Sequence, residues 1–514
     1  MTDSGDPSRP FPPGTYPVVV VGSGPGGLQA SYALRRYGVN HAVISEDPSP
    51  GGMFRRWPFF QRLLSWTKPH APPPLGSRAY ERYDWNSLLA DEPEARALQP
   101  ALMDGSSSFP SRPEMEQNLA LFAERAGIAI RYGCRWTGTR RIDDEGDGGF
   151  VLETTDGEYR AQALVIAVGV AEPYSPPGVG MELTHHYAQV RPAHTYAGHR
   201  VLMLGKQNSG FELANGLLQW ACSIALVSPS PAKFSVQTNS LAGVRARYVQ
   251  PYEDFVLGGG VAVLDAALDR IERTEGGDGS LTVHLRRTDN GESLAVEVDD
   301  VISATGFTTP ILDLPSIGCS VSGRSRLPLV SPWWESTTLP GVYFAGTIGQ
   351  AAKGLVKHGV PANSGAVHGA RYNAMVLAEH LAETRFGRAR SRPGIAADDV
   401  VATIAGELAE APELWHQRAY LARVFTVEPD AGPVDDGVQP LTHFLAAGGP
   451  DAIAVTLEAD GTGAIYPVLY TRIDGEIQEH NIEADPLLRY DGPDVRRAIA
   501  QVAHAVVPAI AAEV

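Results

Sequence analysis

The segment that most restricts the fold of this chain is YPVVVVGSGPGGLQASYALRRYG at 16–38. Its four valines predict a buried strand, and an amphipathic helix follows a turn that carries Gly22, Gly24 and Gly27 in the spacing G-x-G-x-x-G. In such a turn the first glycine allows the tight bend, the second lets the backbone approach a pyrophosphate, and the third lets helix and strand pack closely. The phosphates then lie at the helix N-terminus, where N–H groups without a helical partner favour anions. The segment therefore predicts a doubly wound α/β domain that binds a dinucleotide.

A second strand and an acidic residue complete this unit. HAVISED at 41–47 predicts the strand, and Glu46 follows its apolar part, where a carboxylate accepts hydrogen bonds from ribose hydroxyls. A lone G-x-G-x-x-G is weak evidence, because glycine-rich turns also occur without a ligand. Here strand, turn, helix, second strand and acid follow in the order that a nucleotide site requires. We therefore interpret 16–47 as such a site.

A second segment, HRVLMLGKQNSGFELANGLLQWA at 199–221, repeats the order of strand, turn and helix. Gly205, Ser209 and Gly210 occupy fingerprint positions, but Gln207 stands where the second glycine belongs. A side chain there crowds a pyrophosphate, because the missing Cβ is what allows the close approach. Two interpretations stay open. Either the site binds a nucleotide that is slightly displaced or accepts a hydrogen bond from Gln207, or it is a structural copy that has lost its ligand.

The strand that follows, at 223–228, bears on which nucleotide this second site prefers. Its end, ALVSPSPAKF, has no acid to hold a free ribose 2′-hydroxyl and no arginine pair for a 2′-phosphate. Lys206 and Lys233 are the nearby cations before Arg245. Because an acid at this position favours NADH, its absence favours NADPH.

Composition narrows the class of protein. The chain has 514 residues and a formal net charge of −17, which argues against nucleic acid or an anionic membrane as a partner. It has no apolar run long enough for a transmembrane helix, and its polar N-terminus lacks the pattern of a signal peptide. We therefore expect a cytoplasmic protein. Arginine far outnumbers lysine, a bias typical of GC-rich bacterial genomes.

The cysteines predict neither a redox pair nor a metal site. Cys134, Cys222 and Cys319 are far apart in the sequence, and none belongs to a C-x-x-C motif. No cluster of cysteine and histidine has the spacing of a zinc site.

The chain is too long for a single core, and its patterns divide it into several parts. The proline- and aromatic-rich segment 58–112, called the excursion below, has little periodicity and is expected to line a ligand cavity. GRARSRPG at 387–394 predicts a linker. We expect two Rossmann-like domains and a small C-terminal α+β appendage. The expected bounds are 1–14 for a flexible tail, 15–174 and 295–386 for the first nucleotide-binding domain, 175–294 for the second, and 395–514 for the appendage.

Several further segments resemble the two-dinucleotide-domain flavoproteins: GGMF at 51–54, strand ends at Gly169 and Gly306, and YFAGT at 343–347. In that superfamily the N-terminal site holds FAD, a nicotinamide domain interrupts the FAD domain, and the chain then returns to complete it. The resemblance also implies that a helix beginning near Ser364 points its N-terminus at the pyrimidine edge of the flavin. The contacts that it implies are Gly22, Gly24, Gly27, Glu46, Gly52, Gly346 and Thr347 for FAD, and Gly205, Gln207, Ser209 and Gly210 for NADPH.

The connecting segments narrow this resemblance. They are FRRWPFFQRLLSWTK at 54–68, YDWNSLL at 83–89, LGKQNSGFE at 204–212 and VHGARY at 367–372. They are similar to class B-type flavin monooxygenases, which include N-hydroxylases and Baeyer–Villiger enzymes. They resemble still more closely the endoplasmic-reticulum FAD-dependent oxidoreductase group and its bacterial relatives. This chain ends in IAAEV without a retrieval signal, so we do not carry that location over.

The sequence departs from these families at three places. Most disulfide reductases have an aspartate where Thr347 stands. Flavin-containing monooxygenases have an asparagine in the segment that matches 65–68, whereas this chain reads SWTK. Their F-x-G-x-x-x-H signature is not recognisable, and His185 and His186 in the corresponding linker predict a solvated loop.

The resemblance implies a monooxygenase mechanism. NADPH reduces the flavin, the reduced flavin reacts with O₂ to give a C4a-(hydro)peroxyflavin, and one oxygen atom passes to an amine nitrogen or a carbonyl carbon of a small organic substrate. We expect such a reaction in bacterial secondary metabolism. The polar candidates near the flavin are Lys68, Gln350 and His358. The aromatic residues Trp57, Phe59, Phe60 and Trp66 either keep water from the site or pack in the core.

Three other classes stay open. A flavin disulfide reductase needs a dithiol beside the flavin, which this chain lacks. An FAD oxidase or dehydrogenase with a degenerate nicotinamide site is favoured by Gln207. A flavin-binding module without enzymatic activity is the third. The sequence specifies neither the substrate nor the oligomeric state.

Overall fold

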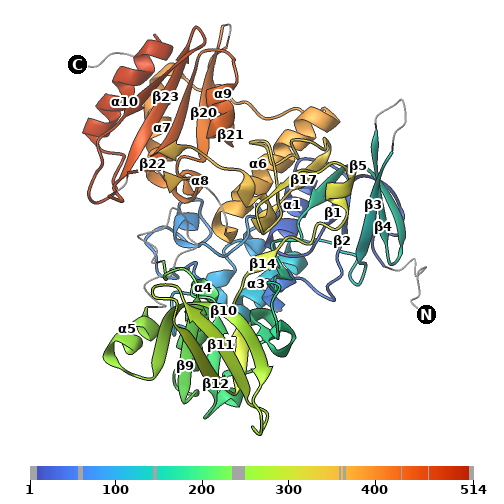
Figure 1. Cartoon of the computed structure of the whole chain (residues 1–514). Coiled ribbons are helices and arrows are strands. Elements are labelled where there is room, and N and C mark those ends of the chain that lie inside the picture. Colours follow the sequence, from blue (N-terminus) through green and yellow to red (C-terminus); the bar gives the residue numbers. More distant parts are fainter. Residues whose placement is uncertain are drawn as a thin grey trace.

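The computed structural model describes residues 9–55, 62–142, 148–233, 249–357, 360–362, 366–429, 431–460 and 462–508. Three large sheets, each packed with helices, form separate parts of the molecule (Figure 1). Within those ranges no helix is both long enough and apolar enough to cross a bilayer. The same ranges contain no group of three His, Cys, Asp or Glu side chains arranged to hold a metal ion.

The first sheet carries the N-terminal fingerprint. Its strands, in spatial order, are β2 (His41–Ile44), β1 (Gly14–Val21), β5 (Gly157–Ile166), β4 (Gly149–Thr154) and β3 (Trp136–Ile142), and β17 (Val342–Phe344) pairs with the end of β5. β1, β2, β5 and β17 are parallel, so their carboxyl ends meet at one edge. β4 and β5 pair as an antiparallel hairpin.

Both faces of β1 are buried. Val18 and Val20 pack against helices on one face, whereas Val19 and Val21 pack in a core on the other. A parallel strand buried on both sides accounts for the unbroken run of valines. The helices on the first face are α1 (Pro25–Arg36), α3 (Arg112–Arg125) and α6 (Val367–Phe386), and the short α2 (Gln99–Leu102) precedes α3.

The flexible tail predicted at the N-terminus is wrong for its described residues, 9–14. The Arg9 guanidinium lies 3.1 Å from the Asp156 carboxylate. The Tyr159 hydroxyl donates a hydrogen bond of 2.7 Å to the Phe11 carbonyl. Short-range patterns do not reveal such contacts, because both partners belong to a distant hairpin.

The second sheet confirms the predicted second unit. Its strands, in order, are β12 (Ser293–Val298), β11 (Leu281–Arg287), β10 (Val261–Arg273), β9 (Ser223–Ser228), β8 (Arg200–Leu204), β13 (Asp300–Ser303) and β7 (His185–His186). The helices of this part are α4 (Asn208–Leu217) and α5 (Gln250–Leu257). β8, a glycine turn, α4 and β9 form the expected strand–turn–helix–strand unit.

β13 pairs with β8, so the second sheet extends past the boundary expected at residue 294. A short, fully buried strand has no pattern that distinguishes one sheet from the other, which is why its sequence did not place it. Gly306 therefore follows a strand of the second sheet. The two segments that connect the sheets pair with each other as β6 (Glu172–Pro173) and β14 (Phe307–Thr308).

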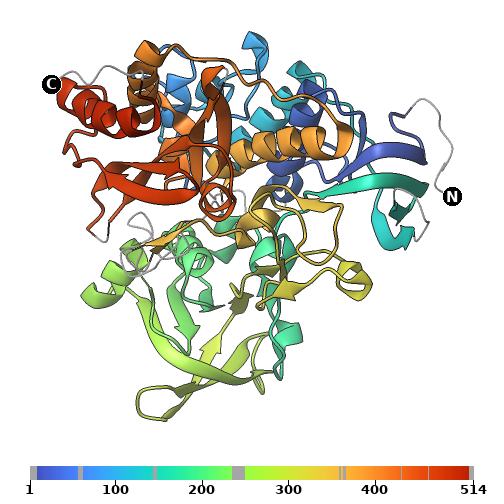
Figure 2. The same cartoon turned by 90° about the horizontal axis from the view of Figure 1, so that it is seen from above.

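The third sheet belongs to the predicted C-terminal α+β domain. Its antiparallel strands are β21 (Gly432–Pro440), β20 (Leu421–Glu428), β22 (Ala452–Ala459), β23 (Ile465–Ile473) and β24 (Glu476–Asn481). Its helices are α7 (Val400–Glu410), α8 (Pro412–His416), α9 (Leu441–Ala446) and α10 (Pro493–Val506). α7 and α10 share a core on one face of the sheet, and α9 contributes to a core on the other. Figure 2 shows α6, in orange, running between this domain and the N-terminal sheet.

Two short hairpins lie in the segment between β14 and α6. They are β15 (Val321–Ser322) with β16 (Leu327–Pro328), and β18 (Val356–Lys357) with β19 (Val360–Pro361).

Candidate functional site

The first fingerprint lies where the parallel strands β1, β5 and β17 end. Gly22 follows β1 with a φ of +115°. A Cβ on Gly22 would lie 2.6 Å from the Ala167 carbonyl oxygen, and a Cβ on Gly27 would overlap the carbonyl oxygen of Gly22. The packing of the protein itself therefore requires both glycines, whatever the site binds.

Gly24 differs, because no atom in the described part of the protein requires a glycine there. Its backbone is extended, with a φ of −76°, and the nearest atom to an added Cβ is the Gly52 Cα, at 4.0 Å. Gly24 is the N-cap of α1, whose first turn contains no acidic residue. This helix N-terminus thus has no carboxylate of its own to compensate it, and the gap beside Gly24 suits an anion. The residues present fit a dinucleotide pyrophosphate.

Two glycines from other segments border this gap. Gly52 has a φ of +54°, and a Cβ on it would lie 3.2 Å from the Gly24 Cα. Gly346, with a φ of +83°, follows β17 and lies against α1, where a Cβ on Gly26 would be 2.6 Å from the Gly346 Cα. The structure thus brings Gly52 and Gly346 to the fingerprint as predicted. Sequence reasoning missed Gly26, because its partner is a distant segment.

The end of β2 lies at the same edge. Glu46 is exposed there, as its spacing predicts for a ribose contact. The neighbouring Ser45 is buried, and its Oγ lies 2.8 Å from the Ser23 Oγ in the glycine turn. This serine pair joins the turn to β2, and no spacing signal announces it. On the opposite side, the Thr347 Oγ1 lies 3.4 Å from the position of a Cβ on Gly169.

The second fingerprint repeats the packing of the first. Gly205 has a φ of +130°, and a Cβ on it would overlap the Ala304 carbonyl oxygen. A Cβ on Gly210 would overlap the carbonyl oxygen of Gly205. These two overlaps correspond to those at Gly22 and Gly27. The tight turn and the close helix–strand contact are therefore both retained.

Gln207 occupies the position that Gly24 has in the first site. It is the N-cap of α4, with an extended backbone at a φ of −120°, and its side chain is exposed. The backbone accepts a side chain here without strain, so any cost of Gln207 falls on the ligand. The first turn of α4, which includes the half-buried Ser209, contains no acidic residue.

Lys206 is not available to a 2′-phosphate, contrary to its sequence-based candidacy. It is buried, donates a hydrogen bond of 2.7 Å to the Leu264 carbonyl and forms an ion pair with Asp265. Lys233 is exposed beyond β9 and keeps its candidacy. Arg245 lies outside the described residues.

Of the three polar candidates near the flavin, the structure describes Lys68 and Gln350. Lys68 is exposed, with its Nζ 4.5 Å from the centroid of the Trp66 ring. Gln350 is half-buried in the 3₁₀ turn that begins at Gly346. His358 lies outside the described residues. Trp57, Phe59 and Phe60 also lie outside them.

Trp66 belongs to an aromatic cluster that joins three parts of the chain. Its ring centroid lies 4.5 Å from that of Trp85 in the excursion. Trp85 stacks on His368 in the first turn of α6, at 4.3 Å, and lies 5.4 Å from His416 at the end of α8. Trp66, Trp85 and His416 are half-buried. The cluster therefore packs the excursion and the C-terminal domain beside the helix N-terminus expected to face the flavin.

Arg371 joins two of the more specific sequence segments, VHGARY at 367–372 and YDWNSLL at 83–89. Only 1% exposed, it donates to the carbonyl of Asp84 at 2.7 Å, and to those of Ser87 and Glu81. The segment VHGARY thereby holds the segment YDWNSLL by its backbone. Thr67, in the segment where flavin-containing monooxygenases have asparagine, donates at 2.8 Å to the Asp84 carboxylate.

Burial lowers the pKa of His416 well below its usual value, and the charges of Arg371 and His368 lower it further. Neither of its ring nitrogens has a hydrogen-bond partner at ordinary distance. The Arg82 backbone opposes the lowering of the pKa. His416 is therefore a neutral imidazole at neutral pH. Sequence analysis did not single it out, since one histidine in a short helix carries no signal.

The solvated loop predicted for His185 and His186 is wrong for His186. That ring is buried, and its Nε2 lies 3.0 Å from the Gly306 carbonyl oxygen. Burial lowers its pKa. His186 thus joins the two segments that connect the sheets.

The three cysteines are free thiols. Cys134 and Cys319 are buried, and burial raises the pKa of both thiols. Cys222 is exposed on the second domain, just before β9. A raised pKa disfavours the thiolate that redox chemistry needs.

Comparisons with known proteins agree with this geometry. A model of the pyridine nucleotide-disulphide oxidoreductase family matches residues 19–346, which is more than half of the chain. The FAD-dependent oxidoreductase domain-containing protein 2 of Danio rerio is 27% identical over 412 residues, which are 71% of this chain and 58% of that protein. The chain therefore spans less than two thirds of the length of this relative. The match confirms the predicted resemblance to that group.

Solved structures confirm the predicted two-dinucleotide-domain fold. The bacillithiol disulfide reductase of Staphylococcus aureus has a TM-score of 0.55 at 16% identity, covering 72% of this chain and 99% of its own. The ornithine N-hydroxylase of Kutzneria sp. 744 has a TM-score of 0.52 at 17% identity, again over 72% and 99%. At these identities the likeness concerns the fold alone.

Proposed function

Because the chain belongs to the pyridine nucleotide-disulphide oxidoreductase family, we propose that it is an FAD-dependent monooxygenase that takes its electrons from NADPH. One atom of O₂ is transferred to an amine nitrogen or a carbonyl carbon of a small organic substrate. The observation that carries this proposal is a pair of glycine turns, each opening into a helix whose first turn has no acidic residue. Two such sites in one chain suit a resident dinucleotide and an exchanging one.

The thiols support a monooxygenase over a disulfide reductase. Cys134 and Cys319 are free thiols buried in the same core beside the first sheet, and Cys222 is a free thiol exposed on the second domain. A dithiol mechanism needs two sulfurs in contact beside the flavin. These three positions give no such pair.

The protein's part in this reaction is to bind and orient, while bound FAD supplies the hydride and oxygen chemistry. Gly24 and Gly52 border the gap that suits the pyrophosphate, and Glu46 accepts hydrogen bonds from the ribose. The N-terminus of α6 favours negative charge on the pyrimidine edge of the ring. Lys68, Gln350 and His358 remain proposed polar contacts.

Anaerobic reduction tests the proposal. The purified yellow protein is mixed with NADPH, with and without candidate amines and ketones, and flavin bleaching is followed. Labelled ¹⁸O₂ is then admitted and the products are analysed by mass spectrometry. We expect bleaching by NADPH and one labelled oxygen in the product. Bleaching without label in any product would indicate a reductase or an uncoupled oxidase instead.

Gln207 favours one second candidate, an FAD oxidase or dehydrogenase whose nicotinamide site no longer binds. In that enzyme the substrate itself reduces the flavin. If neither NADPH nor NADH bleaches the flavin, while an amine or alcohol does so without oxygen, this second candidate replaces the monooxygenase.

A further inference from the structure

The C-terminal domain contacts two segments that are attached to elements of the proposed FAD site. One is the hairpin β18–β19, which connects the turn at Gly346 with α6. The other is the excursion, which Arg371 fixes to the first turns of α6. The first contact consists of backbone hydrogen bonds and one lysine, whereas the second consists of ion pairs.

The base of the hairpin touches the C-terminal domain through its backbone. The Leu355 N–H donates a hydrogen bond of 2.9 Å to the Ala419 carbonyl, just before β20. A Cβ on Gly354 would overlap that same carbonyl oxygen. The Gly354 N–H donates at 2.7 Å to Ala362, on the other arm of the hairpin. Glycine at 354 therefore lets the two backbones approach closely.

One lysine then joins the hairpin to the C-terminal sheet. The Lys357 Nζ lies 2.6 Å from the Glu458 carboxylate, 2.7 Å from the Tyr470 hydroxyl and 2.8 Å from the Glu479 carboxylate. Each of its three N–H groups thus has an acceptor on β22, β23 or β24. Glu458 is 1% exposed, so its negative charge depends on this cation from another part of the chain.

The choice of lysine is informative in a chain so rich in arginine. An ammonium directs three donors around a point, whereas a guanidinium is a planar fork. Three acceptors from three neighbouring strands match the ammonium. Arginine at 357 would therefore not reproduce these contacts.

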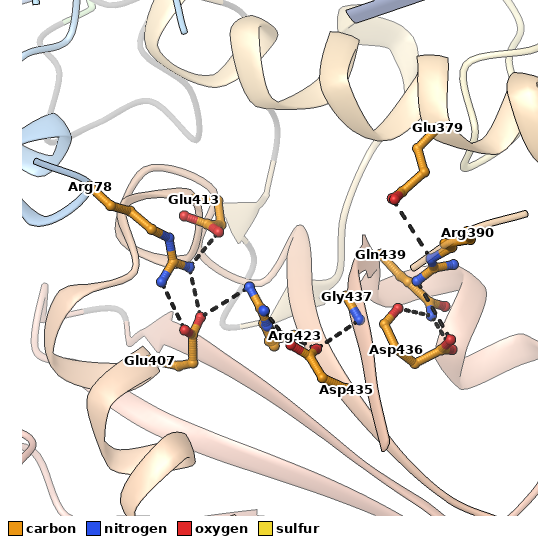
Figure 3. A network of polar contacts seen from close by, with 10 residues as sticks. All are labelled: Arg78, Glu379, Arg390, Glu407, Glu413, Arg423, Asp435, Asp436, Gly437 and Gln439. Atoms are coloured by element: carbon orange, nitrogen blue, oxygen red, sulfur yellow. Dashed lines mark hydrogen bonds and ion pairs between the residues drawn. The ribbon is translucent and has the colours of Figure 1, made fainter. Parts of the chain in front are cut away.

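The excursion is joined to the same domain by a chain of charges (Figure 3). The Arg78 guanidinium donates to both carboxylate oxygens of Glu407 in α7, at 2.8 and 2.7 Å, and to Glu413 in α8, at 2.6 Å. Arg423 in β20 lies 3.6 Å from Glu407 and pairs with Asp435 in β21. The domain is thereby fixed at a second, separate place.

We propose that the C-terminal domain positions the hairpin β18–β19, and with it the Gly346 turn and the start of α6 that the hairpin connects, and that Lys357 is the positioning residue through which it does so. This inference rests on the proposed function only in taking FAD as the resident cofactor. The domain then acts as part of the redox site without supplying the reacting atoms. Removing the lysine leaves the backbone contact between Leu355 and Ala419 as the attachment of the hairpin, so the hairpin should loosen and the FAD site beside the Gly346 turn should change.

Three variants of the full-length, FAD-loaded protein test the inference. Lys357→Met removes the cation and leaves Glu458 buried. The double variant Lys357→Met/Glu458→Gln removes both charges and lets the amide bond with Tyr470. The matched control is Arg392→Met, since Arg392 pairs with Asp436 at 2.7 Å and Glu428 at 2.9 Å without touching the hairpin.

Thermal midpoint, FAD dissociation constant, visible circular dichroism of the flavin and its reduction rate by dithionite and by NADPH are measured for each. Lys357→Met should lower the midpoint, weaken FAD binding about tenfold and alter the flavin spectrum. The double variant should recover the midpoint but not the spectrum or the FAD affinity. The control should lose at most a little stability and keep the wild-type flavin signals.

The two proposals fail in different ways. If wild-type flavin is not reduced by NADPH, the proposed monooxygenase is wrong, whereas the positioning test still reads FAD binding and spectrum. If Lys357→Met and the double variant keep wild-type FAD affinity and spectrum, the positioning role is wrong. Equal changes in Arg392→Met would also overturn it, because the effect would then come from general loosening.

Discussion

At the scale of single residues, the glycines of the two fingerprints are of two physical kinds. Gly22, Gly27, Gly205 and Gly210 are required by protein atoms, because a Cβ on each would overlap a carbonyl or its near neighbours. Gly24 has no such constraint among the described residues. A sequence motif shows all of these as one pattern. The structure separates the glycines that build the turn from the one that the protein's own packing does not require.

This distinction predicts opposite phenotypes in the first site. Gly24→Val should fold normally and lose FAD, because the branched side chain fills only the gap for the pyrophosphate. Gly27→Ala should instead lower the free energy of unfolding by about 2 kcal/mol or more, since its Cβ meets backbone. Bound flavin absorbance and chemical denaturation measure the two effects. Stoichiometric FAD in purified Gly24→Val would show that the gap is not the pyrophosphate site.

The same reasoning gives the prediction for Gln207. Because its backbone is extended and its side chain exposed, Gln207→Gly should leave the free energy of unfolding within about 0.5 kcal/mol of wild type. It should keep or raise the affinity for NADPH, measured by titration of the oxidised protein. Gly210→Val is the contrasting variant and should lower both. A large loss of NADPH affinity in Gln207→Gly would mean that the glutamine itself holds the nucleotide.

At the scale of elements, the parts predicted well are those whose signals are local. The turn at Gly22, the helix after it and the second unit at 199–221 each depend on residues within one strand–turn–helix, so their spacing was enough. β13 was expected in the first domain but pairs with β8 of the second sheet. The sequence of a short buried strand does not indicate which strand it pairs with. The meeting of Trp85, His368 and His416 could not be predicted, since no periodicity links segments so distant.

Arg371 joins α6 to the excursion, and this contact between elements can be tested by mutation. Its buried guanidinium donates to the carbonyls of Glu81, Asp84 and Ser87, and its loss removes one donor from each of them. Arg371→Met should therefore lower the free energy of unfolding by roughly 3 kcal/mol or more. Arg388→Met, on an exposed arginine after the same helix, is the control and should be near neutral. Urea denaturation distinguishes them, and equal stabilities would show that solvent replaces these hydrogen bonds.

At the scale of the whole molecule, α6 relates the FAD half to the C-terminal domain. Its N-terminal end meets α8, and its C-terminal half meets α9 through a stack of rings. Trp333 lies parallel to His380 of α6 at 4.1 Å, and His443 of α9 approaches the same indole at 4.8 Å. The sequence showed the appendage as a separate α+β unit but not its docking, because such contacts join residues with no common spacing.

This stack should make the docked state sensitive to acid. Burial, with a further contribution from His443, lowers the pKa of His380 from 6.5 to about 4, although Glu335 opposes this and Arg390 and Arg385 reinforce it. Burial also lowers the pKa of His443. Between about pH 6.5 and pH 4 the unfolded chain thus binds more protons than the folded one, so stability rises with pH and is lost as pH falls.

The thermal midpoint should therefore fall as the pH is lowered across this window. His380→Phe keeps a stacked ring without a titrating group, so its midpoint should fall less steeply than that of wild type. Parallel curves for the two proteins would show that His416, whose pKa is also lowered, or other groups govern the acid response instead.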